Sequence, residues 1–227
     1  MRVIVLSLGG SLIVPEKMDY NFLKKFKQVI RKTYRTHKFV IVCGGGVLAR
    51  KYISVLKKEE KNHKEVSLAG IEATRMNAHF MTRIFGKEAN SEIPKNMLEV
   101  KNMLEKNKVV FCGALRYAPR ETSDGTAAKL AHYFKTIFIN ITNIDTLYSS
   151  DPSKNKNAKP IRQITWKDFE TIAKKIPFKP GQHFVLDQKA SSLIRKHKIP
   201  TYIIGKKISN LNKILKNQPF LGTSIKG

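Results

Sequence analysis

Cysteine, tryptophan and acidic residues are all scarce in this sequence of 227 residues. The two cysteines, Cys43 and Cys112, each end a short apolar run, so we expect buried free thiols in a reducing compartment and no disulfide. The six histidines are scattered, and no metal-ligand spacing of Cys or His is present. No window approaches the ~20 apolar residues of a membrane span, and the N-terminus has no signal-peptide pattern. We therefore expect a cytoplasmic protein without a resident metal or a membrane partner.

The shortage of acidic residues makes the chain strongly basic. It has 17 Asp and Glu against 43 Lys and Arg, which gives a formal net charge of +26. Taken alone, this charge suggests a polyanion such as nucleic acid as partner. The lysines are nevertheless spread over most predicted helices, and no RNP motif, zinc finger or long basic tail accompanies them. We interpret the charge as a solvated, lysine-rich surface and expect no specific nucleic-acid partner.

Short apolar runs alternate with amphipathic helical stretches along the whole chain. We expect strands at Arg2–Leu8, Phe39–Cys43, Val109–Cys112, Thr136–Ile141, Thr201–Ile204 and Leu221–Ile225. We expect helices from Asp19 to Arg35, directly after Gly46, and at Glu65–Phe85, Met97–Glu105, from Asp124, Asp168–Lys174, Phe184–Lys196 and Ser209–Lys216. In the Glu65–Phe85 helix, the spacing of Met76, Phe80, Met81 and Ile84 predicts core positions. Continuous apolar strands joined through helices predict an α/β fold, a three-layer α/β/α sandwich with a mainly parallel sheet.

Three predicted strands end in turns that suit an anion. The first ends in Gly9-Gly10-Ser11 and the second in Gly44-Gly45-Gly46. The third breaks at Gly113 and continues through an Arg-containing loop into Thr122-Ser123-Asp124, which begins a helix. Glycine lets backbone amides approach a phosphate, and a helix N-terminus favours negative charge. Neither the P-loop motif nor the dinucleotide fingerprint is present. Because the carboxyl ends of parallel strands meet at one edge, we expect the three turns to form one site.

These motifs resemble the amino-acid kinase superfamily and, within it, the archaeal-type uridylate (UMP) kinases. The resemblance covers nearly the whole chain. The segments that carry it are LSLGGSLIVP (6–15), CGGGVLARKYI (43–53), GIEATRMNA (70–78), TSDGTAA (122–128), ITNIDTLYSSDP (141–152) and VLDQKASSLIRKHKIPTYIIG (185–205). The pair GGGVLARKYI and GIEATRMNA is the specific part, because the other segments fit several members of the superfamily. The resemblance implies transfer of the ATP γ-phosphoryl group to UMP, with Mg²⁺ accompanying ATP, in a homohexamer.

The resemblance also implies roles for individual residues. Asp124 would organise the reaction centre, and Arg50 would act with it as a catalytic residue. The implied ATP-binding residues are Ser7, Leu8, Gly9, Gly10, Ser11, Gly46, Arg50, Thr142, Asn143, Tyr148 and Asp151. The implied UMP-binding residues are Gly45, Ser67, Leu115, Arg116, Arg120, Thr122 and Ser123. Within a single domain of residues 1–227, an acceptor-binding lobe would span about 1–117 and an ATP-binding lobe about 118–227.

The chain departs from the family pattern in four places. Many relatives carry lysine at the position of Ser7, and the family's acidic ribose contact falls on Ser67. The P-G-H-T-T-D motif of this branch reads P-R-E-T-S-D here, preceded by about two extra residues. A lysine of the late helix falls on Ser192, with Lys189 one turn earlier. Two of these departures lie in the acceptor pocket, so they bear on the acceptor more than on ATP binding.

Three alternatives remain open from the sequence. The chain fits a kinase of the same fold that acts on another small phosphate or carboxylate. It also fits a catalytically weak nucleotide-binding regulator, given Ser7 and Ser67, and its charge admits a nucleic-acid-binding module. Arg75 and Asn77 fit either a subunit contact or the acceptor site, and we interpret Trp166 as a packing residue.

Overall fold

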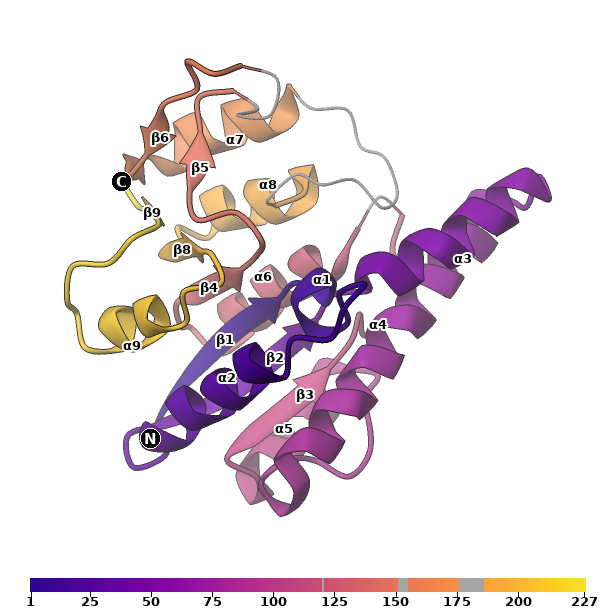
Figure 1. The fold of residues 1–227 in the computed structure, drawn as a ribbon, viewed down its shortest axis with the longest axis horizontal. Coiled ribbons are helices and arrows are strands. Elements are labelled where there is room, and N and C mark those ends of the chain that lie inside the picture. The colour runs from indigo at the N-terminus through magenta and orange to yellow at the C-terminus, as the bar shows by residue number, and fades with distance from the viewer. Residues whose placement is uncertain (120, 151–154, 176–185) are drawn as a thin grey trace.

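A seven-stranded sheet forms the centre of the computed structural model, which describes residues 1–119, 121–150, 155–175 and 186–227 (Figure 1). Its strand order is β3-β2-β1-β4-β8-β9-β7. The strands are β1 (Arg2–Leu8), β2 (His37–Cys43), β3 (Val109–Cys112), β4 (Phe138–Ile141), β7 (Gln163–Ile164), β8 (Thr201–Ile204) and β9 (Thr223–Ile225). β9 runs antiparallel to β8, whereas the other described neighbours are parallel. The predicted, mainly parallel sheet is confirmed.

Helices connect the strands and cover both faces of the sheet. They are α1 (Gly10–Ile13), α2 (Tyr20–Lys32), α3 (Gly46–Lys58), α4 (His63–Phe85), α5 (Met97–Lys106), α6 (Ser123–Tyr133), α7 (Trp166–Lys174), α8 (Gln188–Lys196) and α9 (Ser209–Leu215). Their starts follow ordinary capping chemistry: the side chain of Asp19 accepts a hydrogen bond from the Phe22 amide, and Asn62 forms a capping box with Glu65. A 3₁₀ turn, η1 (Gly86–Glu88), follows α4.

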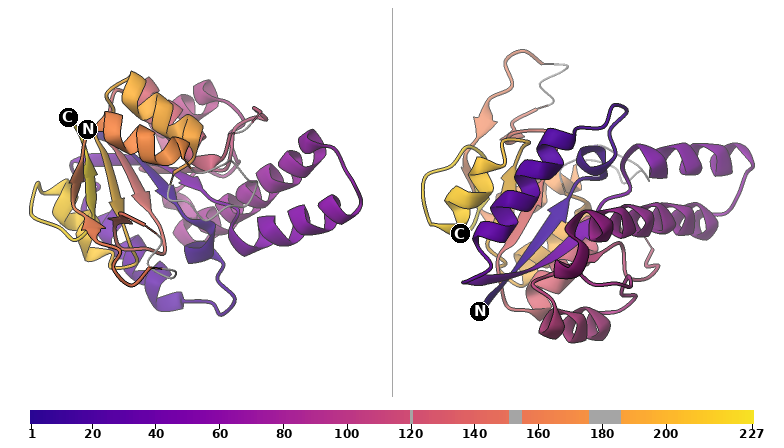
Figure 2. Two further views of the ribbon diagram at one scale, coloured as in Figure 1. Left: turned by 90° about the horizontal axis from the view of Figure 1, so that it is seen from above. Right: turned by 60° about the horizontal axis from the view of Figure 1, so that its bottom comes forward.

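The alternation of side chains along each strand divides the core into two layers. Ile4, Leu6 and Leu8 of β1 pack in one cluster with residues of α2, α4 and α9. Val5 packs on the other face, in a cluster with residues of α5, α6, α7 and α8. Figure 2 shows helices on both sides of the sheet. This is the predicted three-layer arrangement, in which both faces of the sheet are buried.

Helices α3 and α4 pair to form an arm that projects from the body of the molecule (Figures 1 and 2). The prediction that Met76 and Phe80 of α4 lie in the core is wrong, because their exposed fractions are 62% and 36%. Met81 is buried, as predicted, and Ile84 packs against the core. The buried stripe of α4 runs along a different face, so the helix carries a second apolar stripe that faces outward.

The remaining differences from the sequence predictions are mostly at element ends. The predicted helix Phe184–Lys196 begins at Gln188, and its first two residues lie outside the described part of the chain. A two-stranded sheet, β5 (Leu147–Tyr148) with β6 (Pro160–Ile161), was not predicted. Cys43 and Cys112 are buried and free, as expected. Within the described residues, no helix has the length and apolar character needed to cross a membrane.

Candidate active site

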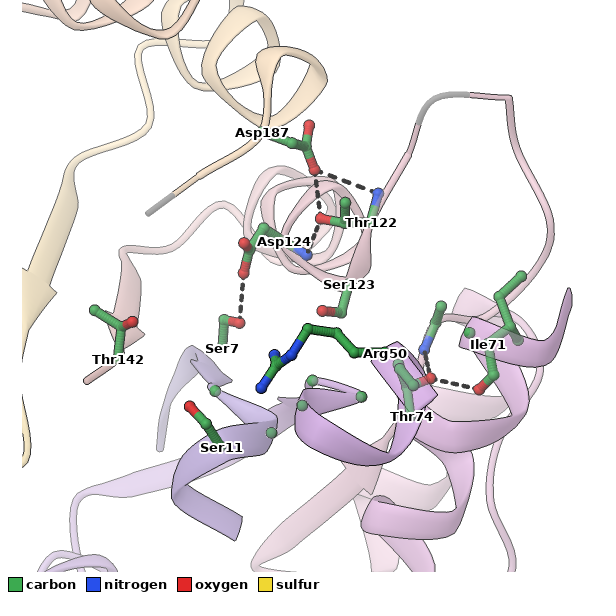
Figure 3. Close-up of a pocket in the computed structure, with 18 of the residues that line it drawn as sticks. Ser7, Ser11, Arg50, Ile71, Thr74, Thr122, Ser123, Asp124, Thr142 and Asp187 are labelled. Carbon is green, nitrogen blue, oxygen red and sulfur yellow. Dashed lines mark hydrogen bonds between the residues drawn. The ribbon is translucent and has the colours of Figure 1, made fainter. Parts of the chain in front are cut away.

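The site lies where parallel strands β1, β2 and β4 end side by side. The strand register places Leu8 opposite both Cys43 and Ile141, so the three following turns meet at one edge of the sheet. Together with α3, α4 and α6 they enclose a cavity of about 230 Å³ (Figure 3). The predicted site residues that line it are Ser7, Gly9, Gly10, Ser11, Gly45, Gly46, Arg50, Ser67, Thr122, Ser123, Asp124, Thr142 and Asn143. The structure therefore brings most of the predicted residues together.

The first two glycine turns contact each other backbone to backbone. A Cβ atom at Gly10 would overlap the backbone of Gly44, Gly45 and Gly46, and Gly46 has a φ of +59°, which favours glycine. The buried Asn77 side chain of α4 donates a hydrogen bond of 2.7 Å to the Gly44 carbonyl oxygen. Asn77 thus fixes the second turn against α4. Sequence reasoning missed this contact, because the two residues lie 33 positions apart.

Arg50 is the one basic side chain among the described residues that line the cavity. It follows the start of α3 at Gly46, and Figure 3 shows it reaching across the glycine turns toward Ser7 and Ser11. The first amides of α3 have no helical partners and lie at the same end of the cavity. An arginine beside free amide groups can neutralise and orient a phosphate.

Asp124 faces the cavity from the first turn of α6. Thr122 caps this helix by accepting a hydrogen bond of 3.1 Å from the Asp124 amide. The hydroxyl of Ser7 donates a hydrogen bond of 2.7 Å to Asp124 Oδ1. Burial raises the pKa of Asp124 to about 7, the Ser7 hydrogen bond lowers it, and the charge of Asp187 raises it further. No described Lys or Arg forms an ion pair with Asp124, so this carboxyl lacks a counter-charge in the free protein.

Asp187 also lines the cavity, and the sequence predictions did not include it. Its Oδ1 accepts a hydrogen bond of 2.7 Å from the Ala190 amide and so caps α8, while Oδ2 accepts one of 2.5 Å from the Thr122 hydroxyl. Asp187 therefore joins the starts of α6 and α8 beside Asp124. An Asp directly before a helical pattern predicts a helix cap. The predicted helix began at Phe184, three residues before Asp187, and so placed Asp187 inside the helix instead of at its cap.

The loop after β3 is held against α4 on the acceptor side of the predicted site. The Ala114 amide donates a hydrogen bond of 2.9 Å to Thr74 Oγ1, and Arg75 Nη2 donates one of 2.8 Å to the Leu115 carbonyl oxygen. Leu115 and Arg116 line a second cavity next to the first. These contacts give Arg75 a loop-positioning role within the chain.

Four of the predicted site residues that the structure describes do not line the first cavity. Leu8 is buried in the core, and Tyr148 lies on β5, where it pairs with Pro160. Leu115 and Arg116 contribute to the second cavity instead. Arg120 and Asp151 lie outside the described residues, as do Pro152, Ser153 and Lys154. The predicted ATP contact of Asp151 therefore lies outside the described part of the chain.

The donor groups of the site fit a hard cation that arrives with a phosphate. Within the described residues, no group of three or more His, Cys, Asp or Glu is placed to hold a metal ion. Asp124 and Ser7 nevertheless present a carboxylate and a hydroxyl oxygen, the type of donor that Mg²⁺ prefers. Mg²⁺ is commonly held by one or two carboxylates together with substrate phosphates. The residues fit this arrangement better than a resident metal.

The glycine turns, Arg50 and the partly buried carboxyl of Asp124 meet at one edge of the parallel sheet. This combination is typical of a site that handles phosphate groups in phosphotransferases. The sequence pattern of the amino acid kinase family matches residues 2–205, and the chain belongs to this family.

Individual relatives extend the comparison. The chain is 35% identical over 205 residues to a uridylate kinase of Thermococcus kodakarensis, with 90% of each chain covered. It is 34% identical over 217 residues to a uridylate kinase of Methanococcus aeolicus, which covers 94% of this chain and 95% of that one. The crystal structure of uridylate kinase from Archaeoglobus fulgidus superposes with a TM-score of 0.84 at 31% identity and covers 99% of this chain and 100% of that one. The expected family and fold are therefore confirmed.

Proposed function

We propose that this protein is a UMP kinase, which transfers the γ-phosphoryl group of ATP to UMP and produces ADP and UDP. The observation that carries the proposal is the cavity in which two glycine turns, Arg50 and the Ser7–Asp124 pair meet at one edge of the sheet. The similarity to uridylate kinases over about nine-tenths of the chain supports UMP as the acceptor. Pyrimidine nucleotide synthesis follows from that reaction.

The donor and the acceptor would occupy opposite ends of the cavity. On the ATP side we place Ser7–Ser11, Gly46, Arg50, Thr142, Asn143, Tyr148 and Asp151. On the UMP side we place Gly45, Ser67, Leu115, Arg116, Arg120, Thr122 and Ser123. Each substrate side takes residues from both of the lobes expected at about 1–117 and 118–227, and the two lobes share one continuous sheet.

The chemistry requires positioning and charge neutralisation, and it requires no general base. The attacking group is a phosphate oxygen of UMP, which is largely ionised near pH 7 because the second pKa of such a phosphate is about 6. Amides of the glycine turns and Arg50 would hold the phosphates and offset their charge. Mg²⁺ bound with ATP supplies further neutralisation of the transferring group. Ionised Asp124, oriented by Ser7, would hold that cation in position.

The test is an ADP-release assay with ATP and Mg²⁺ over UMP, CMP, AMP, GMP and a set of small carboxylic acids. We expect UMP to give the highest kcat/KM. Equal rates with all four monophosphates, or no turnover with UMP, would refute the proposal. An acid that supports turnover in place of UMP would identify the same-fold alternative.

One observation favours a second candidate, a catalytically weak nucleotide-binding regulator. Ser7 occupies the place of a lysine in many relatives, and Arg50 is the one basic residue among the described residues lining the cavity. Calorimetric binding of Mg²⁺-ATP combined with a kcat below about 10⁻² s⁻¹ for every acceptor would support the regulator. Typical enzymes turn over at about 10 s⁻¹.

We further propose that the protein is a cytoplasmic homo-oligomer, a hexamer by family resemblance. The α3–α4 arm supports an oligomer, because Tyr52, Val55, Met76 and Phe80 expose between 36% and 62% of their surface on it. The two free thiols support a reducing compartment. Light scattering coupled to gel filtration measures the mass, and a monomer would refute the oligomer.

A further inference from the structure

One end of the first cavity lies against the α3–α4 arm and is almost free of charged groups. Figure 3 shows Ile71 of the arm and Thr142 on opposite sides of Asp124, so this end lies away from the ATP side. Arg50 is the one charged residue that the arm contributes to the described lining. Beyond it the arm presents a neutral surface, here called the arm face, which consists of Ile53, Ser67, Gly70, Ile71 and Thr74.

The sugar of the acceptor would meet the arm face before the base does. A Cβ atom at Gly45, in the turn proposed for the acceptor, would lie 3.5 Å from the Gly70 carbonyl oxygen and 3.5 Å from Thr74 Cγ2. The arm face therefore begins directly beside that turn. In a nucleoside 5′-monophosphate the sugar is bonded to the phosphate, and the base lies beyond it. A phosphate held at Gly45 thus brings the sugar hydroxyls next to the arm face.

Two hydroxyls are the polar side-chain groups of the arm face, and both already use their protons. Ser67 Oγ donates a hydrogen bond of 2.7 Å to the His63 carbonyl oxygen. Thr74 Oγ1 donates one of 2.6 Å to the Ile71 carbonyl oxygen and accepts one of 2.9 Å from the Ala114 amide. A hydroxyl has a single proton, so these two groups can only accept from a sugar. The arm face therefore offers the sugar neutral acceptors alone.

The acidic residues of α4 lie away from the cavity. They are Glu65 and Glu72, and neither belongs to the described lining. Glu65 Oε2 accepts a hydrogen bond of 3.2 Å from the Asn62 amide in the capping box, and Glu72 is exposed. Helix α3 contains no Asp or Glu. The arm thus supplies no carboxylate that a sugar hydroxyl could reach.

The carboxylates that do line the cavity belong to its α6 side and have partners there. Asp124 and Asp187 lie at the starts of α6 and α8, where each accepts a hydrogen bond from a hydroxyl. Glu121 is paired with Lys129 at 2.5 Å. Among the described residues that line the cavity, no buried side-chain oxygen or nitrogen lacks a hydrogen-bond partner. The cavity therefore holds no polar group that depends on a sugar hydroxyl for its partner.

Resting on the proposed function, we propose that the acceptor site does not select for the 2′-hydroxyl of the sugar, so that the protein also phosphorylates 2′-deoxyuridine 5′-monophosphate (dUMP). A phosphate oxygen of dUMP attacks the γ-phosphorus of ATP, the bond from that phosphorus to the β–γ bridging oxygen breaks, and dUDP and ADP result. A site built around a substrate hydroxyl rejects the analogue without it by about 10⁴–10⁵, because its buried polar groups are left unpaired. On the arm face, a missing 2′-hydroxyl leaves no such group.

The test measures UMP and dUMP side by side on the full chain, by calorimetric binding of each monophosphate and by ADP release with ATP and Mg²⁺. We expect the two binding constants and the two kcat/KM values to agree within about tenfold, because one neutral hydrogen bond contributes no more than that. A larger preference for UMP in either measurement would overturn the proposal. Binding constants that agree within about tenfold, without turnover of either monophosphate, would refute the kinase and retain the unselective sugar site.

Ser67→Asp sharpens the test by placing a carboxylate on the arm face. Hydrogen bonds to a charged group are stronger than neutral ones, so we expect the UMP-to-dUMP ratio of binding constants to rise by about fivefold or more. Ser54→Asp is the matched control, because Ser54 also donates to a carbonyl of its own helix on the arm but does not line the cavity. An unchanged ratio in Ser67→Asp, or an equal rise in both variants, would contradict the proposal.

Discussion

Asp124 and Glu170 are both carboxylates enclosed by the protein, and their surroundings are opposite. Glu170 lies on α7, where Lys174, Ser192 and Arg195 all donate to it, with Lys174 at 2.9 Å and Ser192 at 2.8 Å. Burial alone raises the pKa of Glu170, but these three partners bring it down to about 2. Asp124 has a neutral hydroxyl as its donor, and burial raises its pKa to about 7.

The difference in hydrogen-bond donors shows which of the two carboxyls still has the capacity to bind a ligand. A fully paired carboxylate such as Glu170 stabilises the native state and has no capacity left for a substrate. A buried carboxylate without a cation is costly in the free protein, and such groups are concentrated at functional sites. The contrast therefore distinguishes a carboxyl that stabilises the fold from one whose charge no described Lys or Arg balances.

Asp124→Asn should break this contrast with the largest effect. We expect kcat to fall by a factor of about 10² or more, because the organising charge is lost, while ATP binding stays nearly unchanged. The pKa of Asp124 is higher in the folded state than in the unfolded chain, so its ionisation removes stability as the pH rises from about 4 to 7. The variant should therefore be more stable than the natural protein at pH 8. Steady-state kinetics and urea unfolding at pH 5 and 8 measure both effects, and wild-type turnover would reduce Asp124 to a structural role in the first turn of α6.

The pH dependence of activity should sharpen the contrast. Because kcat/KM reports on the free enzyme, we expect kcat/KM for ATP to fall about tenfold per pH unit below about 7, as Asp124 becomes protonated. Glu170 stays ionised over this range and should contribute nothing. Initial rates with both ATP and UMP well below their KM values, measured between pH 5.5 and 8.5, test this. A profile that is flat across pH 7 would contradict it.

Glu170→Gln should affect stability and leave the chemistry intact. Lys174 and Arg195 are about half exposed, so water screens their charges once the carboxylate is removed, and we expect a loss of about 1 kcal/mol in the free energy of unfolding. The pKa of Glu170 is lowered in the folded state, so its contribution is present above about pH 4.5 and is lost as the pH falls toward 2. Urea titration at pH 7 measures the loss, and a kcat changed by more than about twofold would contradict the assignment.

The smallest expected effect concerns the net charge of +26. Diffuse lysines attract any polyanion weakly at low salt, and each released counterion steepens the loss of binding as salt is added. We expect RNA and DNA binding to disappear by about 0.2 M salt while kinase activity persists. Filter binding and the ADP-release assay at the same salt concentrations compare the two. Sub-micromolar, sequence-selective binding at that salt would favour the nucleic-acid alternative.

Most of the architecture could be predicted because the relevant signals are local. Apolar runs ended at Leu8, Cys43 and Cys112 as the strands do, and Asp19 capped α2 as expected. Periodicity failed on α4, where it could not distinguish between two apolar stripes. Met76 and Phe80 lie on the stripe that faces outward. Which of the two stripes is buried depends on the elements that pack against the helix, and the helix sequence alone does not specify them.

The site was predictable to the extent that it consists of turns at strand ends. Gly10, Gly46, Arg50 and Asp124 lie within or directly after such turns, so the parallel order of the strands brings them together. What sequence reasoning missed depends on pairing between distant positions. Asp187 joins Thr122 across 65 positions, and no local pattern encodes that contact.

The contact between Gly10 and Gly46 constrains how this chain can be recombined with its relatives. Because a side chain at either position would collide with the backbone of the other turn, the two glycines must be inherited together. A chimeric enzyme with a crossover between β1 and β2 will fold an intact cavity only if both parents supply glycine at their half of the contact. Random libraries at these two positions should therefore return glycine.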